Sequence, residues 1–150
     1  MDKQLVKNLI KEFLEKAGVL CTDVEDKDLY NVLTFNILTP EANLLIGKEG
    51  KNLQALNTIL SQMVSVKIPD VRHVNVDVNG YKENAITDLR LKTRKIADDV
   101  IKTKTAIPLQ PMSAYERMLV HSMFSDDFQI ETESAGEGPE RHIIIKYRVI

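Results

Sequence analysis

The chain has 150 residues, of which 43% are hydrophobic and 28% charged, and its net charge is −2. This composition excludes an intrinsically disordered chain, and the slightly acidic balance excludes a polycation that coats nucleic acid without discrimination. No apolar run is long enough to span a bilayer and the first residues lack the apolar segment of a signal peptide, so we expect no membrane insertion. The single cysteine, Cys21, excludes an internal disulfide, and a cytoplasmic setting is therefore expected.

Hydrophobic periodicity predicts helices and strands in mixed order in the first half of the chain. Apolar residues at helical spacing in 5–17 predict an amphipathic helix, with Asp2 as its N-cap and Gly18 just past its end. Residues 24–38 are rich in β-branched and aromatic side chains and predict one or two strands. The remaining elements expected here are a short helical turn at 41–47, an amphipathic helix at 53–64 and an alternating strand at 74–78.

The second half begins after the turn at 79–80 with a long helical pattern at 81–104. Ser113 and Glu116 have the spacing of a capping box, which predicts a helix that ends near Phe124. The other elements expected are a short extended segment between Pro108 and Pro111 and two strands, 128–132 and 143–147, joined by a turn at 134–139. We therefore predict an α+β chain of two modules, residues 1–79 and 80–150.

A glycine loop is the first candidate site. Gly47, Lys48, Glu49 and Gly50 lie between a short helical turn and an amphipathic helix, and Lys51 follows. Glycines let a backbone approach a sugar-phosphate chain closely, and amides at the start of the next helix favour an anion. An ordinary turn between helices is the alternative, because two glycines at this spacing occur often by chance. The position of the loop between predicted strands favours the RNA-binding KH fold, in which such a loop clamps a short stretch of nucleotides.

Arg117 and His121 form the second candidate site, since residues four apart share one face of a helix. We expect both side chains to face outward, where arginine suits phosphate and histidine can donate to a phosphate or stack on a base. Alternatively the pair is a solvated helix face or a tether to the sheet below, and it can also combine structural and binding roles. The side chains expected to face the core instead are Tyr115, Met118, Leu119 and Ser122.

Three stretches of the chain resemble, in order, the Jag family of bacterial proteins, which are also called SpoIIIJ-associated proteins or KhpB. They cover nearly the whole chain, and the second and third are more specific than the glycine loop. The matching stretches are GKEG at 47–50 with LQAL at 53–56, LQPMSAYER at 109–117 with His121, and TESAGEGPER at 132–141.

The resemblance implies a type II KH domain at 1–79, followed at 80–150 by an R-three-H domain with a three-stranded sheet packed by two helices. Both domain types are associated with single-stranded nucleic acid. By this resemblance Gly47–Gly50 is the KH loop, Arg117 and His121 are the Arg-x-x-x-His signature, and Arg141 is the basic residue of the closing hairpin. The family implies a non-catalytic role in post-transcriptional regulation or RNA chaperoning, linked to cell elongation and envelope synthesis. A small single-KH protein or a second copy is the implied partner.

Two departures from the family pattern bear on function. Many relatives begin with an amino-terminal domain and a long charged linker, and neither is present in this sequence. Glu49 stands where relatives often have a basic residue, and a carboxylate beside a phosphate path weakens binding.

Enzyme functions find little support, and we expect no catalysis, cofactor or metal site. His73, His121 and His142 are far apart, a single cysteine gives no zinc spacing, and no phosphate-binding loop of an NTPase is present. We therefore predict a protein that binds single-stranded RNA. A protein-interaction adaptor and a single-stranded DNA-binding module stay open as alternatives, because nothing in the sequence tests for a 2′-hydroxyl.

Overall fold

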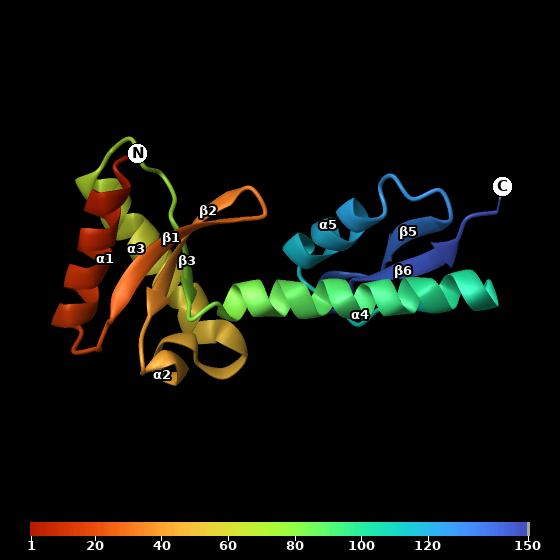
Figure 1. Cartoon of the computed structure of the whole chain (residues 1–150), viewed down its shortest axis with the longest axis horizontal. Coiled ribbons are helices and arrows are strands. Elements are labelled where there is room, and N and C mark those ends of the chain that lie inside the picture. Colours follow the sequence, from red (N-terminus) through yellow and green to blue (C-terminus); the bar gives the residue numbers. More distant parts are fainter. Residues whose placement is uncertain (150) are drawn as a thin grey trace. The chain divides into compact units, whose positions relative to one another are not determined.

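The structure, a computed structural model, describes residues 1–149 and has the predicted α+β class (Figure 1). The chain divides into two compact units, Met1–Asn84 and the part from Ala85 on. The boundary therefore falls a few residues after the turn at 79–80, inside a long helix. The elements of unit 1 are α1 (Lys3–Lys16), β1 (Asp23–Leu29), β2 (Val32–Leu38), α2 (Ala42–Ile46), the 3₁₀ turn η1 (Lys48–Gly50), α3 (Lys51–Lys67) and β3 (Asn75–Val78); α4 (Tyr81–Thr103) begins here.

The first helix begins and ends where the sequence predicts. The Asp2 carboxylate accepts a hydrogen bond from the Leu5 amide at 3.2 Å, which satisfies one of the free donors of the first turn. Gly18 follows the helix with φ +75°, a conformation that glycine adopts without strain. The region 24–38 forms two strands, joined by a tight turn at Tyr30 and Asn31, both in the left-handed region.

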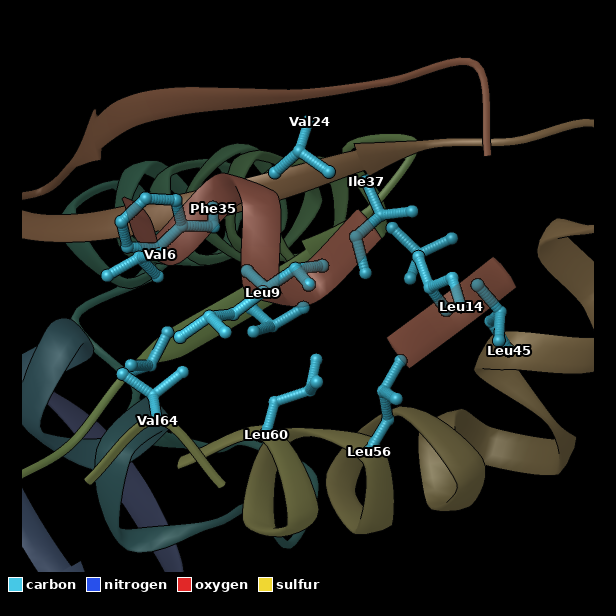
Figure 2. Packing of buried hydrophobic residues seen from close by; sticks show 14 of the residues in the cluster. Val6, Leu9, Leu14, Val24, Phe35, Ile37, Leu45, Leu56, Leu60 and Val64 are labelled. Atoms are coloured by element: carbon cyan, nitrogen blue, oxygen red, sulfur yellow. The ribbon is translucent and has the colours of Figure 1, made fainter. Parts of the chain in front are cut away.

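The sheet of unit 1 has the order β1-β2-β3, with β1 antiparallel and β3 parallel to β2. Its register places Phe35 beside Val76 and Ile37 beside Val78, so that one face of the sheet is apolar. The core lies between this face and two helices, and Figure 2 shows side chains of α1 and α3 packed beneath the strands. The helix residues labelled there are Val6, Leu9 and Leu14 of α1 and Leu56, Leu60 and Val64 of α3.

The opposite face of the sheet carries polar side chains that are nonetheless buried. Asn36 and Asp77 are 3% and 2% exposed, and both accept hydrogen bonds from the chain that follows β3. The Asn36 side-chain oxygen accepts from the Gly80 amide at 3.0 Å, and the Asp77 carboxylate accepts from the amides of Lys82 at 2.9 Å and Glu83 at 3.3 Å. Asp77 thus caps the N-terminus of α4. Burial lowers the pKa of the Lys82 ammonium, although the nearby Asp77 charge opposes this shift.

Unit 2 places a helix pair against a small antiparallel sheet. Its strand order is β4-β6-β5, and its buried core includes Ala97 and Val100 of α4 with Ile143 and Ile145 of the sheet. The predicted capping box is confirmed, because Ser113 and Glu116 each accept a hydrogen bond from the other's amide. Besides the rest of α4, the elements are β4 (Ile107–Pro108), α5 (Ala114–Met123), β5 (Ile130–Ala135), a 3₁₀ turn at Gly138–Glu140 and β6 (His142–Tyr147).

The predicted strand at 128–132 is displaced in the structure. The Asp127 carboxylate accepts hydrogen bonds from the amides of Gln129 and Ile130 at 2.8 and 3.2 Å, and this local turn delays the start of β5. Phe128 consequently lies outside the strand and is 70% exposed. At its other end β5 extends to Ala135, which pairs with β6, so the connecting turn is shorter than the predicted 134–139.

No helix among residues 1–149 is long and apolar enough to cross a membrane.

Candidate nucleic-acid interface

The glycine loop of unit 1 has a backbone that ordinary residues rarely adopt. Gly47 has φ +71° and ψ −176°, Gly50 has φ +76°, and Glu49 between them has φ +56°. The first of these conformations is open essentially to glycine alone, and the left-handed conformation of Glu49 costs about 1 kcal/mol. Strain of this kind persists where the surrounding structure fixes the backbone, and it often marks a functional site.

Side-chain contacts explain why the first glycine is needed. A Cβ added at Gly47 would lie only 2.5 Å from Cγ of Asn52. The Asn52 side chain is held there because its Nδ2 donates to the Leu44 carbonyl oxygen at 3.0 Å, which ties α3 back to α2. A larger residue at position 47 would have to displace Asn52 and break this link.

The second glycine faces an aromatic ring from a distant part of the chain. A Cβ added at Gly50 would come within 3.1 Å of Cε1 of Tyr81, the first residue of α4. The ring therefore occupies the space that a side chain at position 50 would fill. Both residues belong to unit 1.

The loop leads into a helix whose first amides have no side-chain acceptor. No side chain caps α3, which is 17 residues long, so its N-terminus carries partial positive charge beside the loop. Lys48, Glu49 and Lys51 are all exposed and form no ion pair among residues 1–149. The loop therefore presents amides and two free ammonium groups to solvent, with one carboxylate among them.

In unit 2 the Arg117–His121 pair lies at the border between the buried and exposed sides of α5, and not outward as predicted. Both residues are half-buried and both make hydrogen bonds. Nη1 of Arg117 donates to the Met112 carbonyl oxygen at 2.7 Å. The two ring nitrogens of His121 bond Oγ1 of Thr132 at 2.7 Å and Oγ of Ser134 at 3.3 Å, and a hydroxyl can act as donor or acceptor to either nitrogen. The tether to the sheet, left open by the sequence, is therefore present.

The predicted core side of α5 was wrong for three of its four residues. Tyr115 and Met118 are 41% and 52% exposed, and Ser122 is exposed as well. Only Leu119 of these four is buried, and the buried α5 residue that belongs to the core cluster of unit 2 is its neighbour Val120. The apolar stripe is therefore rotated toward Val120, which packs with Phe124, four residues further on, in the same cluster as the sheet residues Ile143 and Ile145.

Arg141 joins the same end of the unit 2 sheet. Its Nη1 donates to the Gly136 carbonyl oxygen at 2.9 Å and so closes the β5–β6 hairpin. Its own carbonyl oxygen accepts from the Met112 amide at 3.2 Å, and Met112 in turn accepts from Arg117. Arg117 and Arg141 are thus linked through one residue, and His121 bonds β5 at Ser134, one residue before the end of that strand. Met112 thus connects Arg117 with the backbone of Arg141, and His121 is attached to the same β5–β6 hairpin.

Sequence reasoning missed the residues that hold both sites in place. Asn52 and Tyr81 contact the loop glycines, while Thr132 and Ser134 bind His121. An asparagine just inside a helix that follows a glycine loop is a weak local signal for Asn52. Tyr81 is 31 positions from Gly50, and no local pattern links the two residues.

No group of three or more histidine, cysteine, aspartate or glutamate side chains among residues 1–149 is placed to hold a metal ion.

Comparison with known proteins identifies the family of this chain. Residues 89–147 match the R-three-H domain, a stretch that lies within unit 2 and contains Arg117, His121 and Arg141. The chain is similar to proteins named RNA-binding protein KhpB. It is 31% identical to that of Clostridium symbiosum over 97% of this chain and 68% of the relative, and 36% identical to that of Bacillus subtilis over 85% of this chain and 62% of the relative.

A third relative, RNA-binding protein KhpB of Lactiplantibacillus plantarum, is 32% identical over 84% of this chain but is covered over only 38% of its own length. The chain thus spans between about two fifths and two thirds of the length of these relatives. The identity to the Clostridium symbiosum protein nevertheless extends over nearly all of this chain and more than two thirds of that protein. The chain belongs to the KhpB family, the Jag family that its three sequence stretches resemble.

Proposed function

We propose that this protein binds single-stranded RNA through two modules and performs no catalysis. The relatives are named RNA-binding proteins, and the R-three-H match supports a second nucleic-acid-binding module. The single observation that carries the proposal is the loop at Gly47–Gly50, where two glycines with positive φ and the exposed Lys48 precede the uncapped N-terminus of α3. These features favour a phosphate chain passing close to the backbone.

We propose that the first module, residues 1–79, is a type II KH domain. In support, its elements run helix, strand, strand, helix, helix, strand, and the glycine loop joins the two central helices. One strand pair of its sheet is parallel and the other antiparallel. In such a module nucleotides lie across Gly47–Gly50 and along α3, with the ammonium groups of Lys48 and Lys51 beside the phosphates.

The second proposed module, residues 80–150, contains Arg117, His121 and Arg141. Arg117 uses one nitrogen to hold Met112, and a guanidinium has further N–H groups that can donate to a phosphate. The same applies to Arg141, in which one nitrogen donates to the Gly136 carbonyl oxygen. We infer that His121 acts mainly by fixing α5 on the sheet, so that Arg117 is held in position for the RNA.

The test is fluorescence anisotropy of a labelled short single-stranded RNA at several salt concentrations. Wild-type protein is expected to bind, with affinity that falls as salt rises, because phosphate binding releases counterions. Gly47→Asp is expected to weaken binding, since it places a carboxylate in the loop and forces Asn52 aside. Gly18→Asp is the matched control, because Gly18 also has positive φ but its added Cβ meets nothing within 4 Å.

Two further variants sharpen the test. Arg117→Ala is expected to weaken RNA binding and reduce its dependence on salt, since one phosphate contact is lost. Glu49→Gln is expected to strengthen binding, because it removes the only carboxylate of the loop. If wild type shows no salt-dependent binding, or Gly47→Asp binds like Gly18→Asp, the RNA surfaces are misassigned and a protein-interaction adaptor is favoured. A deoxyribonucleotide competitor of the same sequence distinguishes RNA from single-stranded DNA.

A protein partner of the first module is also part of the proposal. Ile59 and Val66 are seven positions apart on α3, share one face, and are 47% and 81% exposed. An apolar face of this kind suits a second copy or a small single-KH protein. The wider role that we propose is post-transcriptional regulation or RNA chaperoning linked to cell elongation and envelope synthesis. Deletion of the gene tests this role, and it is expected to alter RNA levels and cell shape.

A further inference from the structure

Tyr81 lies against the glycine loop although it is far from the loop in sequence. A Cβ added at Gly50 would lie 3.1 Å from Cε1, 3.4 Å from the hydroxyl oxygen and 3.6 Å from Cζ of this ring. One edge of the ring, including its hydroxyl, therefore touches the loop where a side chain at position 50 would otherwise stand. The ring takes that place, and Gly50 allows it to do so.

The backbone on both sides of Tyr81 is fixed by buried side chains. The preceding residue, Gly80, donates its amide to Asn36 at 3.0 Å, and the following residue, Lys82, donates its amide to Asp77 at 2.9 Å. Asn36 and Asp77 are 3% and 2% exposed, so these anchors are themselves held in the sheet. The Tyr81 backbone is therefore held in place before any ligand arrives and its ring lies against Gly50, which limits the conformational entropy lost when a ligand packs against it.

Part of the Tyr81 side chain is open to solvent. It is 37% exposed, and its hydroxyl makes no hydrogen bond among residues 1–149. It stands next to a loop whose exposed lysines, Lys48 and Lys51, form no ion pair within the same residues. A preordered aromatic surface beside a cationic backbone loop has the two components that single-stranded nucleic acid needs, a stacking surface for a base and a charged path for its phosphates.

We propose that Tyr81 is a nucleotide-contacting residue of the loop site, on whose ring a base stacks while the adjoining phosphates lie on the Gly47–Gly50 loop. This inference rests on the proposed RNA binding and names a residue of that site. Stacking on an aromatic ring is tolerant of sequence because every base has a π-face. Tyr81 is therefore expected to contribute affinity without dictating which base is bound.

The first test compares RNA binding by wild type with that of Tyr81→Phe and Tyr81→Ala. Loss of a stacking ring weakens binding about 5- to 150-fold, so this loss is expected for Tyr81→Ala, while Tyr81→Phe retains most of the affinity. Leu5→Ala is the control for an exposed side chain elsewhere in unit 1, since Leu5 is 43% exposed on α1. Circular dichroism and hydrogen exchange of the loop amides show whether Tyr81→Ala keeps the loop folded.

A second test removes the base instead of the ring. In a series of RNAs that each lack one base but keep every phosphate, the oligonucleotide that lacks the stacked base binds wild type more weakly. For Tyr81→Ala, that RNA and the intact RNA are expected to bind with equal affinity, because this variant has already lost the stacking interaction. A purely structural role of Tyr81 would give the same penalty with every RNA of the series.

A third test uses the absence of tryptophan from the sequence. Tyr81→Trp gives one reporter, whose fluorescence is expected to be quenched when RNA binds and a base stacks on the indole. The inference is overturned if tryptophan emission is unchanged at saturating RNA, or if Tyr81→Ala and wild type bind with equal affinity. The proposed function still stands in that case, provided that wild type binds in a salt-dependent way and Gly47→Asp loses this binding. If wild type itself does not bind RNA, both are overturned.

Discussion

Replacing His121 by alanine tests whether the signature histidine serves the fold or the ligand. The change removes the imidazole that joins α5 to Thr132 and Ser134 of β5. A hydrogen bond contributes about 0.5–1.5 kcal/mol to stability, and the contact at 3.3 Å belongs at the weak end of that range. Both hydroxyls are half-buried and gain water when the ring is gone. We therefore expect a loss of about 1–2 kcal/mol.

Urea unfolding followed by circular dichroism measures this loss. With a denaturant slope of about 1–3 kcal/mol per molar, the midpoint is expected to fall by roughly 1 M while the slope stays constant. Hydrogen exchange of the α5 and β5 amides localises the effect to unit 2.

The partner hydroxyls provide the control. A chain with Thr132→Val and Ser134→Ala is expected to lose a similar amount, and adding His121→Ala to it is expected to cost little more, since the three side chains form one network. If His121→Ala unfolds like wild type yet loses RNA affinity, the imidazole acts on the ligand directly and the tether reasoning is refuted.

Three further changes test the local devices of the fold. Gly136→Ala is expected to lower the free energy of unfolding by about 2 kcal/mol more than Gly138→Ala, as measured by urea unfolding. Both positions have positive φ, but only at Gly136 would the added Cβ come within 2.7 Å of a backbone oxygen. Asp77→Ala is expected to cost about 2 kcal/mol, because it leaves the partly buried amides that cap α4 without their acceptor. Asp77→Asn, which keeps one acceptor oxygen, is expected to cost less. Hydrogen bonds from the Lys7 ammonium, and then from Lys3, lower the pKa of Asp26 to about 2 from its ordinary value of 3.8. Since the folded-state pKa is the lower one, the stabilisation is full above about pH 4 and lost as the pH falls toward 2; Asp26→Asn is therefore expected to destabilise at neutral pH and to flatten the acid dependence in that interval.

Each of these expectations has a contrary result. Equal unfolding midpoints for the two glycine variants would mean that the hairpin yields at Gly136 without cost. An Asp77→Ala chain as stable as wild type would show that water reaches the first amides of α4. A pH profile for Asp26→Asn parallel to that of wild type between about pH 4 and 2 would show that the lysines do not hold the carboxylate in solution.

Local sequence signals predicted helix boundaries well where the residues that determine the boundary lie within a single short segment. The caps at Asp2 and Ser113 are satisfied within one helical turn, so short-range spacing identifies them. The displaced start of β5 shows the limit of strand patterns. There the Asp127 carboxylate accepts hydrogen bonds from the amides of Gln129 and Ile130, and the alternating pattern of apolar residues gives no sign of these bonds.

The sequence by itself determined the α+β class, the order of helices and strands, and the family to which the chain belongs, because each depends on patterns that neighbouring residues carry. Only the tertiary structure decided which side of α5 meets the core, since that depends on the sheet against which the helix packs. It also decided that His121 bonds β5 and that Tyr81 stands on Gly50. These contacts join residues 11 to 31 positions apart, and the folded chain brings such residues together by burying apolar faces that no local pattern pairs in advance.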